Sequence, residues 1–218
     1  MKVWKRYKRY LLTGEWHIHT NYTDGKNTVI EYCKLAEKKD IPLLAFTEHV
    51  RKNITYNFNK FLEDIEKARD EFDIIILSGC EAKVLPGGEL DVEKWIIESV
   101  DYPILAFHSF SKDMEIYVES LKIALQNKYV NAWAHPGLFL QRNKVTLDEC
   151  VLREIFKIMK NHDVLLEINK KYDLPPKNWL LIAKKYGVKL VKGNDLHSVE
   201  DYYRFSPWSQ SSERRWIP

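Results

Sequence analysis

The sequence is short of cysteine and of long apolar runs, and each shortage excludes a class of protein. Its three cysteines, Cys33, Cys80 and Cys150, are odd in number and widely spaced. We therefore expect neither a disulfide framework nor a thiolate zinc site, and a reducing environment is favoured. No run approaches the roughly 18 apolar residues of a membrane span, and no apolar signal segment follows the basic N-terminus. These features predict a soluble, cytoplasmic protein with no membrane partner.

Charge of one sign is also scarce, because 34 basic and 31 acidic side chains leave a net charge of +3 over 218 residues. This balance does not indicate nucleic-acid binding, although it suits a phosphorylated substrate. The exception is the segment 2–10, KVWKRYKRY, which mixes five basic residues with aromatic ones. Such a segment could bind phosphates and stack on bases, but a solvated edge is the commoner structure and the favoured interpretation.

Apolar and amphipathic segments alternate along the chain, whose length suits one domain spanning 1–218. Strand-like runs recur seven times, as WHIHT, LLAFTEH, IIILSGCEAKV, YPILAFHS, NAWAHP, VLLEIN and VKLVKGNDLHS. Helical periodicity marks 27–40, 57–72, 91–100, 113–127, 146–162 and 175–186. The alternation predicts an α/β fold with a parallel sheet, either open and doubly wound or closed into a barrel. Only 206–218 look irregular.

Two local patterns refine this prediction. Thr146 and Glu149 have the spacing of a capping box at the start of a helix. Glycine is scarce, with 8 in the chain, and no glycine-rich fingerprint follows the first predicted strand. A dinucleotide-binding version of the fold is therefore disfavoured.

Histidines and acids stand at the C-terminal ends of the predicted strands. These residues are His17, His19, His49, Glu81, His108, His135, Glu167, Asp195 and His197. Only one of the seven histidines, His162, lies elsewhere, near a predicted helix C-terminus, where we interpret it as structural. In a parallel barrel the C-terminal ends of the strands meet on one face, where such folds build their active sites. The side chains are therefore predicted to converge.

This convergence points to metal ions. His17 and His19 project to the same side of an extended strand, and Asp24 in the next turn could add an oxygen. Imidazole nitrogens and carboxylate oxygens suit zinc, manganese or iron, and without a metal the buried cluster would be costly to desolvate. Nine candidate ligands exceed the need of one ion, so two or three divalent ions are expected. Such a site activates water and stabilises an in-line displacement.

Seven motifs in order, EWHIHTNYTDG, FTEH, SGCEAKV, FHS, AHPG, LEIN and GNDLHS, resemble those of the PHP (polymerase and histidinol phosphatase) family over residues 13–198. The resemblance implies a distorted (β/α)7 TIM-like barrel with a trinuclear metal centre that hydrolyses phosphoesters. The implied ligands are His17, His19, Asp24, His49, Glu81, His108, His135, Asp195 and His197, with Glu81 bridging. Glu15 and Glu48 stand where the family commonly has Asp, and we interpret them as groups that orient an imidazole or pack the barrel.

The favoured function is a metal-dependent phosphoesterase that hydrolyses a phosphomonoester, as histidinol phosphatases do, through a metal-activated hydroxide. The candidate catalytic residues are Glu81, Asp195 and His197, and the candidate substrate-binding residues are Lys83 and Arg142. Two alternatives stay open. One is an exonuclease or phosphodiesterase that acts on nucleic acid or nucleotides, and the other is a non-catalytic metal-binding accessory module.

Overall fold

A computed structural model describes residues 1–205 of the protein. The irregular tail expected at 206–218 lies outside the described residues. Within residues 1–205, no helix has the length and the apolar character needed to cross a lipid bilayer. The described chain is built around one sheet.

Seven parallel strands form this sheet, and their order in the sheet is their order in the chain. They are β1 (Glu15–Ile18), β2 (Leu43–Val50), β3 (Ile75–Lys83), β4 (Tyr102–Ala106), β5 (Ala132–Trp133), β6 (Leu165–Ile168) and β7 (Leu190–Lys192). The segment after β7 closes the sheet against β1, because the N–H of His19 donates to the carbonyl of Leu196 (2.8 Å) and the N–H of Leu196 donates to the carbonyl of His17 (3.0 Å). The predicted (β/α)7 TIM-like barrel is thus confirmed. Its distortion includes a register shift within β1 and a two-residue β5.

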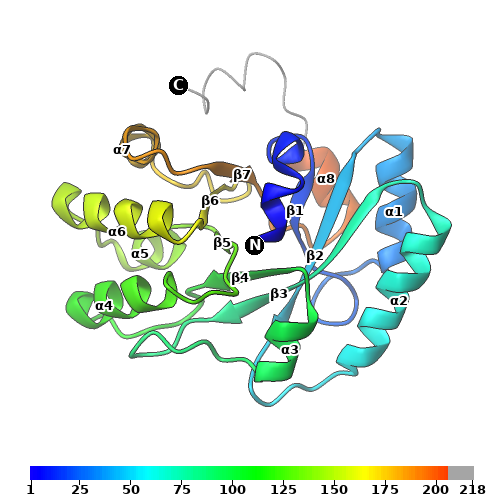
Figure 1. The fold of residues 1–218 in the computed structure, drawn as a ribbon, viewed down its shortest axis with the longest axis horizontal. Helices are drawn as coiled ribbons and strands as arrows, with labels where there is room; N and C mark the ends of the chain where they lie inside the picture. Colours follow the sequence, from blue (N-terminus) through cyan, green and yellow to red (C-terminus); the bar gives the residue numbers. More distant parts are fainter. Residues whose placement is uncertain (206–218) are drawn as a thin grey trace.

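Helices alternate with the strands and lie around the outside of the sheet (Figure 1). They are α1 (Val29–Lys38), α2 (Phe58–Glu71), α3 (Lys94–Ser99), α4 (Met114–Ala124), α5 (Leu138–Asn143), α6 (Glu149–Asn161), α7 (Lys177–Lys185) and α8 (Val199–Phe205), preceded by the 3₁₀ turns η1 (Val3–Lys5) and η2 (Lys8–Tyr10). All six predicted helical segments are present. The two additional helices, α5 and α8, have only six and seven residues, too few to show helical periodicity.

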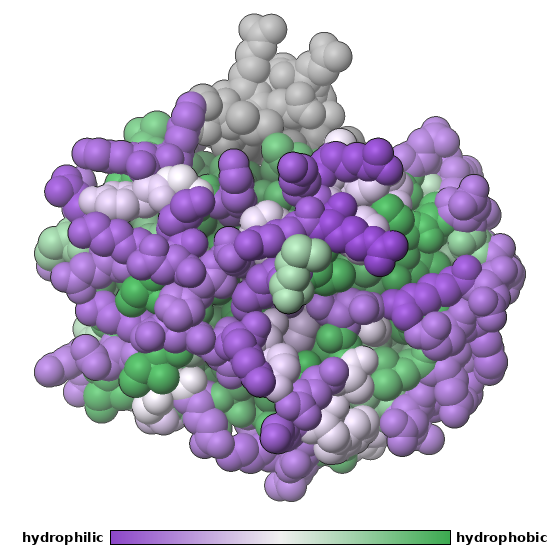
Figure 2. Space-filling view, viewed as in Figure 1, coloured by the Kyte–Doolittle hydropathy of each residue, from purple (hydrophilic) through white to green (hydrophobic). Residues whose placement is uncertain are grey.

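The helices bury an apolar stripe and expose a polar face. In α6, for example, Leu152, Ile155, Phe156 and Met159 are buried. Figure 2 shows that hydrophilic side chains cover most of the visible surface. This division of each helix into a buried and a solvated face is what holds it against the sheet.

The capping box predicted from Thr146 and Glu149 is wrong. The helix α6 begins at Glu149 itself, and Asp148 is its N-cap without a side-chain capping hydrogen bond. Glu149 is therefore the first helical residue and not the third, which a capping box requires. A complete capping box does occur at α1, where Thr28 and Glu31 bond to one another's backbone N–H.

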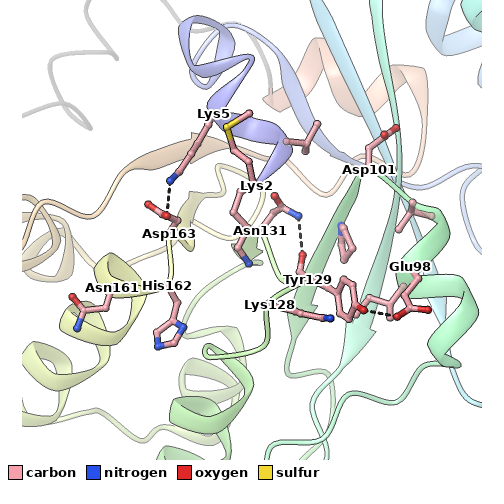
Figure 3. Close-up of a pocket in the computed structure, with 15 residues that line it drawn as sticks. Lys2, Lys5, Glu98, Asp101, Lys128, Tyr129, Asn131, Asn161, His162 and Asp163 are labelled. Carbon is pink, nitrogen blue, oxygen red and sulfur yellow. Dashed lines mark hydrogen bonds and ion pairs between the residues drawn. The ribbon is translucent and has the colours of Figure 1, made fainter.

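The N-terminal segment packs across the end of the barrel where the strands begin. Trp4 is buried in the same apolar cluster as Leu43 and Ile104, and its Nε1–H donates to the carbonyl of Asp163 (2.9 Å) just before β6. Lys5 pairs with the carboxylate of Asp163, beside a cavity of about 590 Å³ (Figure 3). The basic segment considered for nucleic-acid binding is thus partly a structural cover of this end of the barrel.

Candidate metal centre

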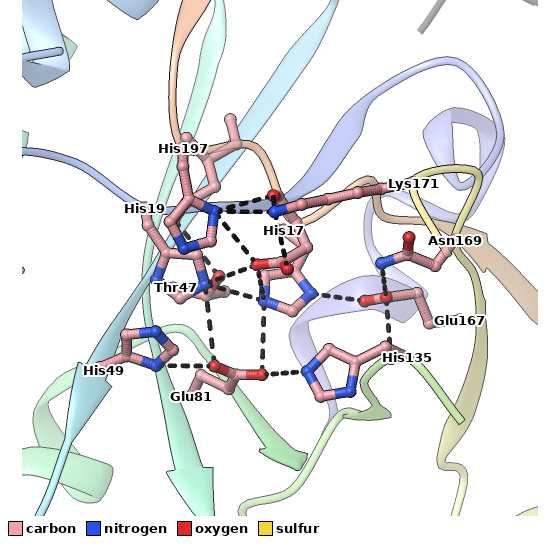
Figure 4. A network of polar contacts seen from close by, with 12 residues as sticks. His17, His19, Thr47, His49, Glu81, His135, Glu167, Asn169, Lys171 and His197 are labelled. Carbon is pink, nitrogen blue, oxygen red and sulfur yellow. Dashed lines mark hydrogen bonds and ion pairs between the residues drawn. The ribbon is translucent and has the colours of Figure 1, made fainter. Parts of the chain in front are cut away.

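The nine predicted ligands lie together at the C-terminal ends of the strands (Figure 4). β2 and β3 supply His49 and Glu81, and β1 supplies His17 with His19 directly behind it. The others come from the loops that follow β1, β4, β5 and β7, and they are Asp24, His108, His135, Asp195 and His197. A small cavity of about 160 Å³ opens over this cluster. The predicted convergence is therefore present in the structure.

Glu81 is completely buried at the centre of the cluster. Its Oε1 lies 2.8 Å from Nε2 of His135 and 3.5 Å from Nε2 of His17. Its Oε2 lies 2.8 Å from Nδ1 of His49 and 3.1 Å from Nε2 of His108. Even so, Oε2 of Glu81 and Nδ1 of His49 make no hydrogen bond among the described residues. Close, buried lone pairs without a proton between them are what a shared cation would explain.

The electrostatics of the cluster also favour bound cations. Burial alone would raise the pKa of Glu81, but His108 and His17 hold it well below its usual range. Burial would lower the pKa values of His17 and His49, yet the carboxylates around them, Glu167 and Glu81 for His17 and Asp24 and Glu81 for His49, raise these values to about 9 and about 10. The buried carboxylates therefore require positive charge nearby, which either protons or metal ions can provide.

His17, His19 and Asp195 form one compact group. Nε2 of His17 lies 3.0 Å from Nε2 of His19, and Oδ1 of Asp195 lies 3.1 Å from Nε2 of His19. The other ring nitrogen of His17, Nδ1, lies 2.8 Å from Oε2 of Glu167. Because a proton on Nδ1 satisfies this carboxylate, the lone pair of Nε2 is free to bind a metal.

Glu167 orders this side of the centre without being a predicted ligand. Its Oε1 accepts hydrogen bonds from the backbone N–H of His135 and from Nδ2 of Asn169, both at 2.9 Å. Gly193 makes room for it, since a Cβ at this position would lie 2.5 Å from Oε2 of Glu167 and 2.9 Å from Cβ of His17. A glycine is therefore required where β7 passes the pair.

Asp24, His49 and His197 form the outer side of the centre. Oδ1 of Asp24 lies 3.4 Å from Nε2 of His49 and 3.3 Å from Nε2 of His197. Hydrogen bonds from these two imidazoles lower the pKa of the exposed Asp24. The neighbouring Gly25 packs on the main chain, because a Cβ there would lie 2.3 Å from the carbonyl oxygen of His19. The tight turn brings Asp24 back over the histidines.

Three groups of side chains in the described part of the chain could each hold a metal ion. They are His17 with His19 and Asp195, His49 with Glu81 and His108, and His19 with Asp24, His49 and His197. His135 is outside these groups but contacts Glu81. Two of the candidate ligands, His135 and Asp195, have positive φ angles of 30° and 51°. Backbone strain of this kind is common where a site holds residues in place.

Lys171 and Tyr172, which the sequence analysis did not identify, hold Asp195 from the side away from the histidines. Nζ of Lys171 donates to the carbonyl (2.8 Å) and to Oδ2 (3.1 Å) of Asp195. The hydroxyl of Tyr172 donates to the same Oδ2 (2.9 Å). Both residues also line the cavity. Their only signal in the sequence is their place in the loop after β6, because no motif includes them.

The two predicted substrate-binding residues differ in position. Arg142 in α5 lines the cavity, with its guanidinium 5.9 Å from the centre of the Tyr172 ring. Lys83 is the last residue of β3 and is not among the residues that line the cavity. The structure therefore brings Arg142, and not Lys83, to the mouth of the centre.

Glu15 and Glu48 support the scaffold around the site. Glu15 pairs with Lys192 (2.6 Å) in the barrel wall and accepts a hydrogen bond from Asn194. Glu48 is buried and accepts hydrogen bonds from the N–H and hydroxyl of Thr20 and from the hydroxyl of Thr23. Its printed partners lie in the turn between His19 and Asp24, so it orders this turn.

Comparisons with known proteins agree with the fold and the motifs. The chain is 28% identical over 202 residues to the DNA polymerase/3'-5' exonuclease PolX of Bacillus subtilis (strain 168), which covers 87% of this chain but only 35% of PolX. The chain thus spans about a third of that relative. It is also 28% identical over 204 residues to a protein of Acetivibrio thermocellus named "Probable phosphatase", covering 87% of this chain and 81% of that one.

Among solved structures, the histidinol phosphate phosphatase of Lactococcus lactis, in complex with zinc, L-histidinol and phosphate, superposes with a TM-score of 0.67. The two share 20% sequence identity, and the match covers 86% of this chain and 87% of the other. This likeness shows the same fold. The family model described as PHP domain matches residues 15–171. The chain therefore belongs to the PHP domain family.

Proposed function

We propose that this protein is a metal-dependent phosphoesterase that hydrolyses a small phosphomonoester with two or three divalent ions. The observation that carries the proposal is the buried Oε2 of Glu81, which has no hydrogen-bond partner among residues 1–205 although two imidazoles lie within 3.1 Å of it. The relatives support the same chemistry. One is named a probable phosphatase, and the protein of similar fold holds zinc and phosphate.

The residues present fit such ions. A neutral imidazole offers one lone pair, and His19 and His49 each belong to two of the three possible groups. The groups therefore compete for these nitrogens, which is why we propose two or three ions. Nitrogen and oxygen donors without thiolate suit zinc, manganese or iron. In this arrangement Glu81 bridges, and Asp195 with His197 completes the outer ligand set.

When bound, the ions would lower the pKa of a water molecule and neutralise the charge that develops on the phosphate. The protein orients the groups around them. Lys171 and Tyr172 hold Oδ2 of Asp195, so that Oδ1 faces His19. Lys171 and Arg142 also line the cavity, where their positive charges favour phosphate oxygens. In His197, Nδ1 lies 2.9 Å from the carbonyl of Asp195, which leaves Nε2 as the ligand atom.

Hydrolysis of nucleic acid is the second candidate, because the name of PolX includes a 3'-5' exonuclease. The basic N-terminal segment that motivated this alternative packs at the end of the barrel where the strands begin, away from the metal centre. A compact cavity of about 160 Å³ at the centre also favours a single phosphate group over a nucleic-acid strand. A phosphomonoester is therefore the preferred substrate.

The test is an assay of purified protein that has been stripped of metal and reloaded with zinc or manganese. We expect turnover of phosphomonoesters, and Glu81→Gln should lower kcat/KM at least about 100-fold, because loss of a metal-site residue typically has an effect of this size. Glu119→Gln, at an exposed position of α4, is the matched control and should behave as the wild type. Bound metal without any phosphoesterase activity would instead support an accessory module, and turnover restricted to oligonucleotides would support a nuclease.

A further inference from the structure

A second cavity adjoins the metal centre on the side of the loop that follows β2. It has a volume of about 340 Å³ and is lined by Tyr22, Thr23, His49, Arg51, Asn53, Ile54, Thr55 and Tyr56. His49 lines this cavity and the cavity of the metal centre alike. Thr23 lines one and its neighbour Asp24 the other. A molecule held by its phosphate at the metal centre can therefore extend past His49 into the second cavity.

The sizes of the two cavities suggest a division of labour. Sites for small organic molecules typically have volumes of about 300–1,000 Å³. The cavity of the metal centre, about 160 Å³, lies below this range, and the second cavity lies within it. The metal centre alone thus has room for the phosphate, and the second cavity has room for the group to which the phosphate is attached.

The walls of the second cavity are aromatic and fixed. The rings of Tyr22 and Tyr56 have their centres 6.1 Å apart and are inclined at 46°. The hydroxyl of Tyr22 donates to Asp64 (2.6 Å), and that of Tyr56 donates to the carbonyl of His49 (3.1 Å). Burial raises the pKa of Tyr56, so this phenol stays neutral. Both polar ends are occupied, and the rings with the half-buried Ile54 offer the cavity mainly apolar surface.

The only arginine or lysine in the lining is already engaged. Nη1 of Arg51 donates to the carbonyl of Val50, and its Nε lies 3.7 Å from Asp91. Asn53 and Thr55 are exposed at the rim. The interior therefore favours a flat apolar group, which can pack against aromatic rings, over a second charged group or a polyol.

We propose that the second cavity binds the alcohol half of the substrate and that the substrate is a phosphomonoester of an aromatic or heteroaromatic alcohol. This inference rests on the proposed function of the metal centre. Tyr22, Ile54 and Tyr56 are then specificity-determining residues, and their contacts add to binding without taking part in the cleavage of the P–O bond.

The experiment compares kcat/KM for phenyl phosphate and glycerol 2-phosphate on metal-loaded protein. We expect a preference for phenyl phosphate of at least about 10-fold, the size expected for one aromatic packing contact. Ile54→Trp, which fills the cavity, and Tyr22→Leu, which removes one wall, should each lower this ratio about 10-fold. Ile116→Trp, at an exposed position of α4, is the matched control and should keep the ratio of the wild type. Equal turnover of both esters, or a ratio that neither variant changes, would overturn the inference.

A binding measurement separates failure of this inference from failure of the proposed function. Phenylphosphonate and methylphosphonate contain no P–O–C bond to cleave, and their affinities can be measured by calorimetry on the metal-loaded protein. Tighter binding of phenylphosphonate that Ile54→Trp abolishes would support the cavity even in a protein without phosphatase activity. Equal affinities, or tighter binding of a 5'-phosphorylated dinucleotide with the same dependence on Ile54, would contradict a small aromatic ester.

Discussion

Glu167 and His17 form a buried pair in which Oε2 of the carboxylate lies 2.8 Å from Nδ1 of the imidazole. The pair is built from the two ends of the barrel sequence, since 150 residues separate its members. It sets the orientation of the His17 ring, and with it the direction in which Nε2 faces the other ligands. The ligand set therefore depends on a residue that binds no metal itself.

Glu167→Gln tests this dependence. The amide keeps the size of the side chain but removes the charge that holds the proton on Nδ1 of His17, so we expect metal affinity to fall about 10- to 100-fold. Titration of the stripped protein with zinc, followed by calorimetry, measures the change. Glu119→Gln is again the control. An unchanged affinity in Glu167→Gln would mean that His17 does not need this carboxylate.

Lys171→Met removes the cation that holds Asp195. Loss of a charge-assisted hydrogen bond typically costs about 1.5–3 kcal/mol, so metal affinity should fall by at least about 10-fold. Tyr172→Phe removes one neutral donor and should have a smaller effect. Lys177→Met, at an exposed position of α7, is the control. A larger loss in Tyr172→Phe than in Lys171→Met would contradict the proposed order of importance.

Trp4→Ala should destabilise the fold while sparing the metal centre. Trp4 is buried at the opposite end of the barrel, and replacement of a buried tryptophan by alanine typically lowers the free energy of unfolding by about 3–5 kcal/mol. Lys8→Ala changes an exposed residue of the same segment and should have an effect of less than about 0.5 kcal/mol. Urea unfolding of metal-saturated protein measures both. Equal stability of the two variants would show that the segment does not cover the barrel.

The three thiols should differ in reactivity. Burial raises the pKa of Cys33 to about 12 and that of Cys80 further, so both stay protonated near neutral pH, whereas Cys150 is exposed in α6. A thiol reagent at pH 8 should therefore modify one cysteine per folded chain and three after denaturation. Mass spectrometry locates the modified residue. Rapid labelling of Cys80 in the folded protein would contradict its buried place behind Glu81.

Much of the fold can be predicted from the sequence because the strands and longer helices carry their pattern locally. The predicted helix 57–72, for instance, is observed as Phe58–Glu71. The start of α6 was wrong because Asp148 competes with Thr146 for the N-cap, and the choice depends on tertiary packing. α5 is too short for periodicity to show.

The candidate ligands can also be predicted, because a parallel barrel converts strand ends into one cluster. The residues around them are harder to find. Lys83 follows Glu81 by two positions but does not line the cavity, whereas Lys171 reaches Asp195 through a loop whose conformation no motif specifies. The loop 51–56 likewise becomes part of a cavity only through its place beside Tyr22.

The central claim is that the clustered imidazoles and carboxylates hold more than one metal ion. Anomalous X-ray scattering from a crystal of zinc- or manganese-loaded protein tests it most directly. The account predicts two or three peaks among the nine ligands, with one of them touching Oε2 of Glu81. A single peak, or none, with Glu81 and its histidines in the positions described here would contradict it.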